Sequence, residues 1–151
     1  MKIKEIMHTG VKSCSPESAL DAVALEMWNN DCGVVPIIDD EGKPVGIVTD
    51  RDIAIGGAIQ HKPLWEIKSK DITRNRQLFM CKTDDDISAA LELMKQNQVR
   101  RLPVVDEHGR LAGILSLCDV FTHTDSAKGH GRKAQISDDM ALATMRAVVS
   151  H

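Results

Sequence analysis

The fold is decided by residues 34–53, which run VVPIIDDEGKPVGIVTDRDI, and by a related stretch at residues 101–120, which runs RLPVVDEHGRLAGILSLCDV. Each stretch contains two short apolar runs joined by five residues rich in Asp and Gly. Such a connection between β-branched runs is typical of a β-hairpin, and its glycine supplies the positive φ that the turn needs. The sequence therefore predicts one hairpin in each stretch.

The two hairpins belong to an internal repeat with an offset of 67 residues. When residues 14–53 are laid on residues 81–120 without a gap, ten of the 40 positions are identical. Ordinary composition would give about two or three identities by chance. The match extends back to Glu5-Ile6 and Asp71-Ile72 at an offset of 66. The chain is therefore a tandem duplication.

One helix is predicted before each hairpin and another after it. The apolar residues of 20–28 recur at the spacing of one buried helical face, and those of 87–94 repeat the pattern. The second helices are expected near residues 51–60 and 118–123. With a short strand at its start, each copy has the order strand, helix, strand, strand, helix. We expect an α+β fold.

The predicted organisation has four parts, which are repeat 1 at 1–60, a linker at 61–70, repeat 2 at 71–124 and a tail at 125–151. Within the tail, Ser137 to Asp139 has the composition of a helix start. The helix is expected to continue to Val149 and to dock on the module or on a second subunit.

Each hairpin contains two residues that are costly in a plain strand, Pro36 and Gly46 in the first copy and Pro103 and Gly113 in the second. Proline removes a ladder donor, so these prolines are expected at a sheet edge or a bulge. A strand glycine often marks the close approach of another backbone or of a ligand. An irregularity that serves only the fold is the alternative. Because both features recur in both copies, we favour a cleft bordered by these strands.

Composition excludes several classes of function. The chain is 42% hydrophobic and 27% charged, with a formal net charge of −3, and a nucleic-acid surface would require a basic excess. No apolar stretch is long enough for a membrane span. The N-terminus lacks the apolar core of a signal peptide, so we expect a cytoplasmic protein. The four cysteines and six histidines form no metal-binding or disulfide pattern.

The sequence favours ligand binding over catalysis, because it contains no recognisable catalytic motif. Each copy ends its second strand with a hydroxyl residue and places an aspartate three positions later, as Thr49-x-x-Asp52 and Ser116-x-x-Asp119. Amides at a helix start attract phosphate, and a carboxylate can accept hydrogen bonds from two ribose hydroxyls. The alternative is local helix capping, which favours the same residue types.

Two arginines, Arg100 and Arg101, directly precede the Leu102 strand. Their planar donors suit phosphate, although a solvated basic spot explains them equally well. The first copy has Gly33 and Val34 at these positions. The two predicted clefts therefore differ in charge.

Taken together, these motifs resemble a tandem pair of cystathionine-β-synthase (CBS) domains, a Bateman module, over about residues 4–124. The resemblance implies two β-α-β-β-α repeats related by a pseudo-twofold axis, with small three-stranded sheets flanked by helices. It implies clefts that bind AMP, ADP, ATP or S-adenosylmethionine as a regulatory ligand, with no catalytic cofactor. It also implies a homodimer and a downstream protein partner, which the sequence does not name. A ligand-free interaction or oligomerisation scaffold is the alternative function.

The resemblance also implies a set of ligand-binding residues, which comprises Ile47, Thr49, Asp52, Arg100, Arg101, Val34, Val35, Ile114, Ser116 and Asp119. By this resemblance Asp52 and Asp119 hold ribose hydroxyls, Ile47 and Ile114 contact adenine, and Arg101 contacts phosphate.

In such families each site combines the T/S-x-x-D motif of one half with the strand entry of the other. The resemblance therefore pairs the Thr49–Asp52 motif with Arg100 and Arg101, and the Ser116–Asp119 motif with residues 33–35. We expect the Asp52 cleft to bind a phosphorylated nucleotide more tightly than the Asp119 cleft.

Overall fold

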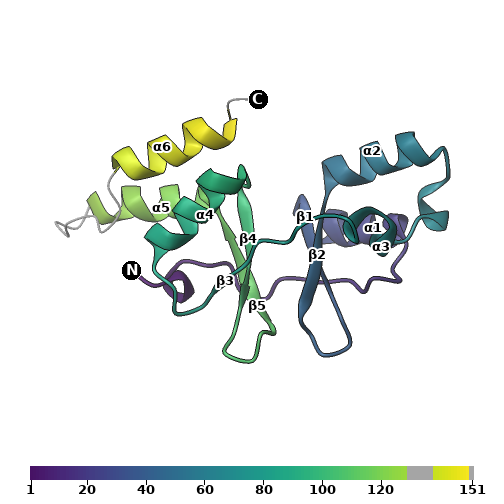
Figure 1. Cartoon of the computed structure of the whole chain (residues 1–151), viewed down its shortest axis with the longest axis horizontal. Helices are drawn as coiled ribbons and strands as arrows, with labels where there is room; N and C mark the ends of the chain where they lie inside the picture. Colours follow the sequence, from purple (N-terminus) through teal and green to yellow (C-terminus); the bar gives the residue numbers. More distant parts are fainter. Residues whose placement is uncertain (129–137, 150–151) are drawn as a thin grey trace. The chain divides into compact units, whose positions relative to one another are not determined.

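The computed structural model describes residues 1–128 and 138–149, which form two compact units (Figure 1). The repeat-1 unit comprises Val11–Leu78 and Gly109–Leu111. The repeat-2 unit comprises Met1–Gly10, Phe79–His108 and the chain from Ala112 onward. Each unit mixes helices with a small sheet, which confirms the predicted α+β class.

The repeat-1 unit contains, in chain order, α1 (Leu20–Asn29), β1 (Val34–Ile38), β2 (Pro44–Thr49), α2 (Asp50–Gln60), η2 (Leu64–Glu66) and α3 (Ser69–Thr73). Strands β1 and β2 form the predicted antiparallel hairpin, with Val34 opposite Thr49. A single parallel bridge from Cys14 to Ile37 takes the place of the predicted first strand.

The repeat-2 unit contains η1 (Ile3–Glu5), β3 (Cys81–Lys82), α4 (Ile87–Asn97), β4 (Arg101–Val105), β5 (Leu111–Ser116), α5 (Leu117–Lys128) and α6 (Asp138–Val149). The sheet has the strand order β3-β4-β5. Helix α5 continues five residues beyond its predicted end at residue 123. Helix α6 packs against α4 and α5, and the predicted first residue of the tail helix, Ser137, lies outside the described residues.

Each unit has its own apolar core, formed by the helix and strand faces that the periodicity predicts. In the repeat-1 unit, Leu20 and Val23 of α1 pack with Val48 of β2, and all three are fully buried. In the repeat-2 unit, Ile87 of α4 and Leu115 of β5 have the positions equivalent to Leu20 and Val48, and both are buried. Burial of such side chains contributes about 1.5–3 kcal/mol each.

Each unit is completed by the segment that precedes the other sequence repeat. The N-terminal Ile3 is buried in the core of the repeat-2 unit, and its backbone N–H donates to Asp85 O at 3.0 Å. The inter-repeat Ile67 is buried in the core of the repeat-1 unit, where its carbonyl accepts from Leu20 N at 2.9 Å. The compact units therefore interleave along the sequence.

The strand glycines are explained by this interleaving. A Cβ on Gly46 would lie 2.7 Å from Thr73 Cβ, and one on Gly113 would lie 2.5 Å from the backbone oxygen of His8. The close approach that the glycines predict is thus made by the chain itself.

The prolines lie in the strand that receives the parallel partner. Strand β4 is the middle strand of its sheet, so the predicted edge position is wrong for Pro103. Its parallel partner begins opposite Val104, one residue beyond the proline. Pro36 likewise precedes Ile37, which bridges to Cys14 and begins a bulge.

Candidate functional site

Thr49 and Asp52 form a capping box at the start of α2. The backbone N–H of Asp52 donates to Thr49 Oγ1 at 3.1 Å, and the backbone N–H of Thr49 donates to Asp52 Oδ2 at 2.9 Å. Both side chains are partly buried. The capping role that the T-x-x-D spacing suggests is therefore confirmed, and it orients the carboxylate at the end of β2.

Ser116 and Asp119 repeat this arrangement at the start of α5. Asp119 N donates to Ser116 Oγ at 3.2 Å, and Ser116 N donates to Asp119 Oδ2 at 2.7 Å. The Ser116 hydroxyl also donates to the same Oδ2 at 2.7 Å. Both hydrogen bonds that the Asp119 carboxylate accepts from Ser116 thus end on Oδ2, and Oδ1 takes no part in the box.

Arg76 distinguishes the first site from the second. Its Nη1 lies 2.6 Å from Asp52 Oδ1, and the Asp52 side chain is only 17% exposed. Burial alone would raise the pKa of the Asp52 carboxyl, but the hydrogen bonds from Arg76 and Thr49 outweigh burial and hold the pKa below its ordinary value. Sequence reasoning missed Arg76, because it lies in the segment after α3 and matches no motif.

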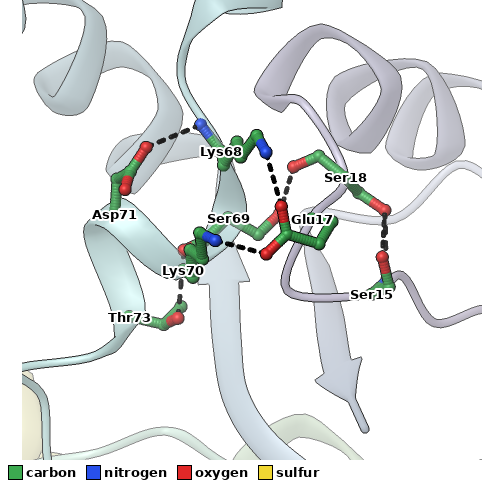
Figure 2. Close-up of polar contacts among 8 residues, drawn as sticks. All are labelled: Ser15, Glu17, Ser18, Lys68, Ser69, Lys70, Asp71 and Thr73. Atoms are coloured by element: carbon green, nitrogen blue, oxygen red, sulfur yellow. Dashed lines mark hydrogen bonds and ion pairs between the residues drawn. The ribbon is translucent and has the colours of Figure 1, made fainter. Parts of the chain in front are cut away.

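The position of Arg76 is set by α3, which ion pairs and a hydrogen bond join to the segment that precedes α1. Figure 2 shows the Glu17 carboxylate between the ammonium groups of Lys68 and Lys70, with an ion pair to each. Ser69 donates through its hydroxyl to Ser18 O at 2.9 Å. The backbone N–H of Arg76 then donates to Thr73 O at 3.0 Å. This sequence of contacts fixes the chain from which Arg76 reaches Asp52.

The other predicted residues differ widely in exposure. In the repeat-1 unit, Ile47 is partly buried, whereas the Val35 side chain is fully buried in the core and Val34 is 9% exposed. In the repeat-2 unit, Ile114 is buried at 6% exposure.

Arg100 and Arg101 are exposed, and in the described part of the chain neither has a carboxylate within ion-pair distance. They belong to the repeat-2 unit, whereas the Thr49–Asp52 motif belongs to the repeat-1 unit. The predicted pairing of each motif with the strand entry of the other repeat remains a prediction.

A separate groove of about 530 Å³ lies between α1 and α2. Its lining is mostly apolar and comprises Ala24, Met27, Trp28, Asp31, Cys32, Gly33, Asp50, Ile53 and Ala54. Trp28 is 84% exposed. Thr49 and Asp52 are not part of this lining, so the groove and the capping box are distinct features of the repeat-1 unit.

Across residues 1–128 and 138–149, no three His, Cys, Asp or Glu side chains gather as they would around a metal ion. None of the helices described is long and apolar enough to span a bilayer.

The chain belongs to the CBS domain family. The family's sequence profile matches residues 3–55 and again residues 70–125, so it covers both halves of the duplication. The chain is a CBS domain pair, and the resemblance inferred from the repeated hairpin and T/S-x-x-D motifs is confirmed.

Similar sequences occur in small bacterial proteins. Hypoxic response protein 1 of Mycobacterium tuberculosis is 32% identical over 120 residues, which are 80% of this chain and 82% of that protein. The CBS domain-containing protein YhcV of Bacillus subtilis is 30% identical over 133 residues, which cover 85% of this chain and 89% of YhcV.

Other relatives are longer than this chain. The match spans 61% of an uncharacterized protein of Methanopyrus kandleri. It spans only 23% of inosine-5′-monophosphate dehydrogenase from Methanocaldococcus jannaschii, at 35% identity over 120 residues.

Solved structures have the same fold. The structure of Hypoxic Response Protein I with two coordinated zinc ions has a TM-score of 0.74 and 31% identity, and covers 82% of this chain and 98% of that one. The CBS domain pair of protein MJ0100, solved with 5′-methylthioadenosine and S-adenosyl-L-methionine, has a TM-score of 0.73 at 23% identity, over 83% of this chain and 97% of that one. CBSX2, solved with AMP, has a TM-score of 0.71 at 23% identity, and the match covers 84% of this chain and 98% of that one.

Proposed function

We propose that this chain is a non-catalytic regulatory module that binds an adenosyl ligand at Asp52 and Asp119. The observation that carries the proposal is the recurrence of one arrangement, a strand end with a capping box and an aspartate carboxylate, at equivalent positions of both repeats. A carboxylate held in this way can accept hydrogen bonds from two neighbouring ribose hydroxyls. Structures of related fold hold AMP, 5′-methylthioadenosine and S-adenosyl-L-methionine.

The ligand would transmit a signal only through a difference in affinity between two conformations of the protein. In this proposal the strand residues Ile47 and Ile114 contact the adenine, and Arg100 and Arg101 contact phosphate at the Asp52 site. The valines of residues 34–35 contribute to the Asp119 site. The four free cysteines support a location in the reducing cytoplasm.

Calorimetric titration of the full chain with AMP, ATP and S-adenosylmethionine tests the proposal. The matched variants are Asp52→Asn and Asp119→Asn, because the asparagine oxygen can still accept the capping hydrogen bond while the negative charge is lost. Each variant should lose binding at one site and keep its fold. Absence of heat with all three ligands would overturn the proposal.

The choice of asparagine matters for the interpretation. Asp52→Ala would remove the N3 half of the capping box and the partner of Arg76, and would cost about 1–2 kcal/mol of folding free energy. Urea unfolding should show this loss for the alanine variant and a smaller loss for the asparagine variant. A similar stability of Asp52→Ala and wild type would contradict the capping role.

The second candidate function is a homodimeric scaffold, and the groove between α1 and α2 favours an interface there. Leu25 and Trp28 are 59% and 84% exposed, whereas the equivalent positions of repeat 2 carry the charged pair Glu92 and Lys95. Large exposed apolar side chains beside a groove are typical of an interaction surface. A stable dimer that gives no heat with any adenosyl ligand would favour the scaffold.

A further inference from the structure

The carboxylates of the two aspartates in the proposed ligand sites differ in their hydrogen bonds. Both oxygens of Asp52 accept hydrogen bonds, Oδ2 from the Thr49 backbone at 2.9 Å and Oδ1 from Arg76 at 2.6 Å. The bonds to Asp119 come from Ser116 and end on Oδ2 alone. At the offset of 66, the position equivalent to Arg76 is Gly10, which has no side chain to offer.

The backbone of Arg76 is held in a position from which its side chain can compete with a ligand for Asp52. Thr73 is buried and lies directly against Gly46, and the carbonyl of Thr73 accepts from the Arg76 backbone. The Arg76 side chain is 53% exposed, whereas Asp52 is 17% exposed. The guanidinium can therefore leave for another anion without unfolding its segment, while the carboxylate stays in place.

We propose that Arg76 gates the Asp52 site and makes it selective for adenosyl ligands that carry a phosphate. The proposal rests on the function proposed above, because it requires ribose hydroxyls to bind Asp52. To do so they must displace the guanidinium from Oδ1. A charge-assisted pair of this kind is stronger than a hydrogen bond from a neutral hydroxyl.

Displacement by a neutral ligand such as adenosine leaves the guanidinium without its anion, so the exchange is unfavourable. A nucleotide supplies a replacement, because arginine binds phosphate oxygens through two parallel donors. The ligand's phosphate thus compensates for the lost ion pair. No such exchange is needed at Asp119, so AMP and adenosine should differ less in affinity there.

The test is a titration of AMP and adenosine into wild type, Arg76→Gln and the control Arg74→Gln. Arg74 is an exposed arginine two residues away on the same segment. An Asp119→Asn background isolates the Asp52 site. Arg76→Gln should bind adenosine about tenfold more tightly and AMP about tenfold more weakly than wild type. Arg74→Gln should match wild type.

The readout is the ratio of the AMP affinity to the adenosine affinity. A general loss of stability would not strengthen the binding of one ligand while weakening the binding of the other. Arg76→Lys is the second variant, which keeps the charge and should keep part of the preference for AMP. The gate alone is overturned if Arg76→Gln binds AMP with an unchanged ratio of affinities while Asp52→Asn no longer binds AMP. Failure of every variant and of wild type to bind AMP or adenosine overturns the proposed function, and the gate with it.

Discussion

Asp52 and Asp119 show how a single carboxylate can serve the fold and remain suited to a ligand. Each closes the first turn of its helix, and each sits at a strand end in the same position of its repeat. The capping and ligand-binding interpretations of the T/S-x-x-D motif are therefore compatible. The difference between the two sites arises from Arg76, outside the motif.

Gly46 gives a prediction at the scale of the residue. Gly46→Ala should lower the free energy of unfolding by about 1–3 kcal/mol, because the added methyl group has no room beside the buried Thr73. Gly33→Ala is the control, since its added Cβ would meet only the mobile end of Asp50, at 3.1 Å. Urea unfolding of both variants checks the prediction. Equal stability of Gly46→Ala and wild type would contradict the packing described.

The same glycine shows what a sequence can predict about a site. Its unusual position in a strand correctly predicted a close neighbour. The identity of that neighbour, a side chain of α3, depends on how the inter-repeat segment folds back, and no local pattern encodes this. The pairing of Arg76 with Asp52 joins residues 24 positions apart and escaped prediction for the same reason.

At the scale of the element, the hairpins and helices follow from local periodicity and turn chemistry, and were predictable. The short segments η1 and α3 could not be predicted, because each is too short to show a periodic pattern. Segment η1 precedes repeat 1 but completes the core of the repeat-2 unit, and α3 precedes repeat 2 but completes the core of the repeat-1 unit. Helix α3 is instead fixed by tertiary contacts, which include the burial of Ser69 and Thr73 and the ion pairs of Glu17 with Lys68 and Lys70 (Figure 2).

The stabilisation of α3 by the ion pairs of Glu17 depends on pH. The hydrogen bonds from Lys68 and Lys70 lower the pKa of Glu17 from 4.5 to about 2. Because the folded pKa is below the unfolded one, the ion pairs stabilise the fold fully above pH 4.5, and this contribution is lost as the pH falls from 4.5 to about 2.

Glu17→Gln should remove this part of the acid sensitivity. The contribution is small because Glu17 is solvent-exposed. Unfolding free energies of wild type and Glu17→Gln should therefore converge as the pH is lowered from 7 to 3. Glu66→Gln, an exposed glutamate in η2, is the control and should show no convergence. A constant difference between wild type and Glu17→Gln across this range would refute the assignment.

Helix α6 offers a second prediction at this scale. Its buried face contains Ala141 and Val148, at 1% and 3% exposure, whereas Met145 is 43% exposed. Val148→Asp should release α6 from α4 and α5 and lower stability by about 1–3 kcal/mol. Met145→Asp should have little effect. Limited proteolysis and urea unfolding distinguish them, and equal behaviour of the two variants would count against the docking.

At the scale of the whole molecule, the two repeats share a helix, a hairpin and a second helix in the same order, but their surfaces differ. Helix α6 packs on α4 and α5 of repeat 2 (Figure 1). In repeat 1, the groove between α1 and α2 is lined by Trp28, which is 84% exposed. The sequence showed the duplication because the repeat is long. This difference in surface could not be predicted, because it depends on where the tail helix packs.

The proposed homodimer should therefore depend on Trp28. Trp28→Glu is expected to convert the dimer to a monomer, because a charged side chain would be buried in an apolar interface. Trp65→Glu is the matched control, since Trp65 is also exposed, at 68%, but lies in η2 outside the groove. Light scattering coupled to gel filtration gives the mass of each. A dimeric Trp28→Glu protein would exclude this interface.

The most direct test of the central claim is a crystal structure of the full chain grown with saturating AMP. The account predicts that the two ribose hydroxyls lie within hydrogen-bond distance of the carboxylate of Asp52, with the Arg76 guanidinium moved from Oδ1 to the phosphate. AMP bound away from both Asp52 and Asp119, or absent from both at saturation, would contradict it.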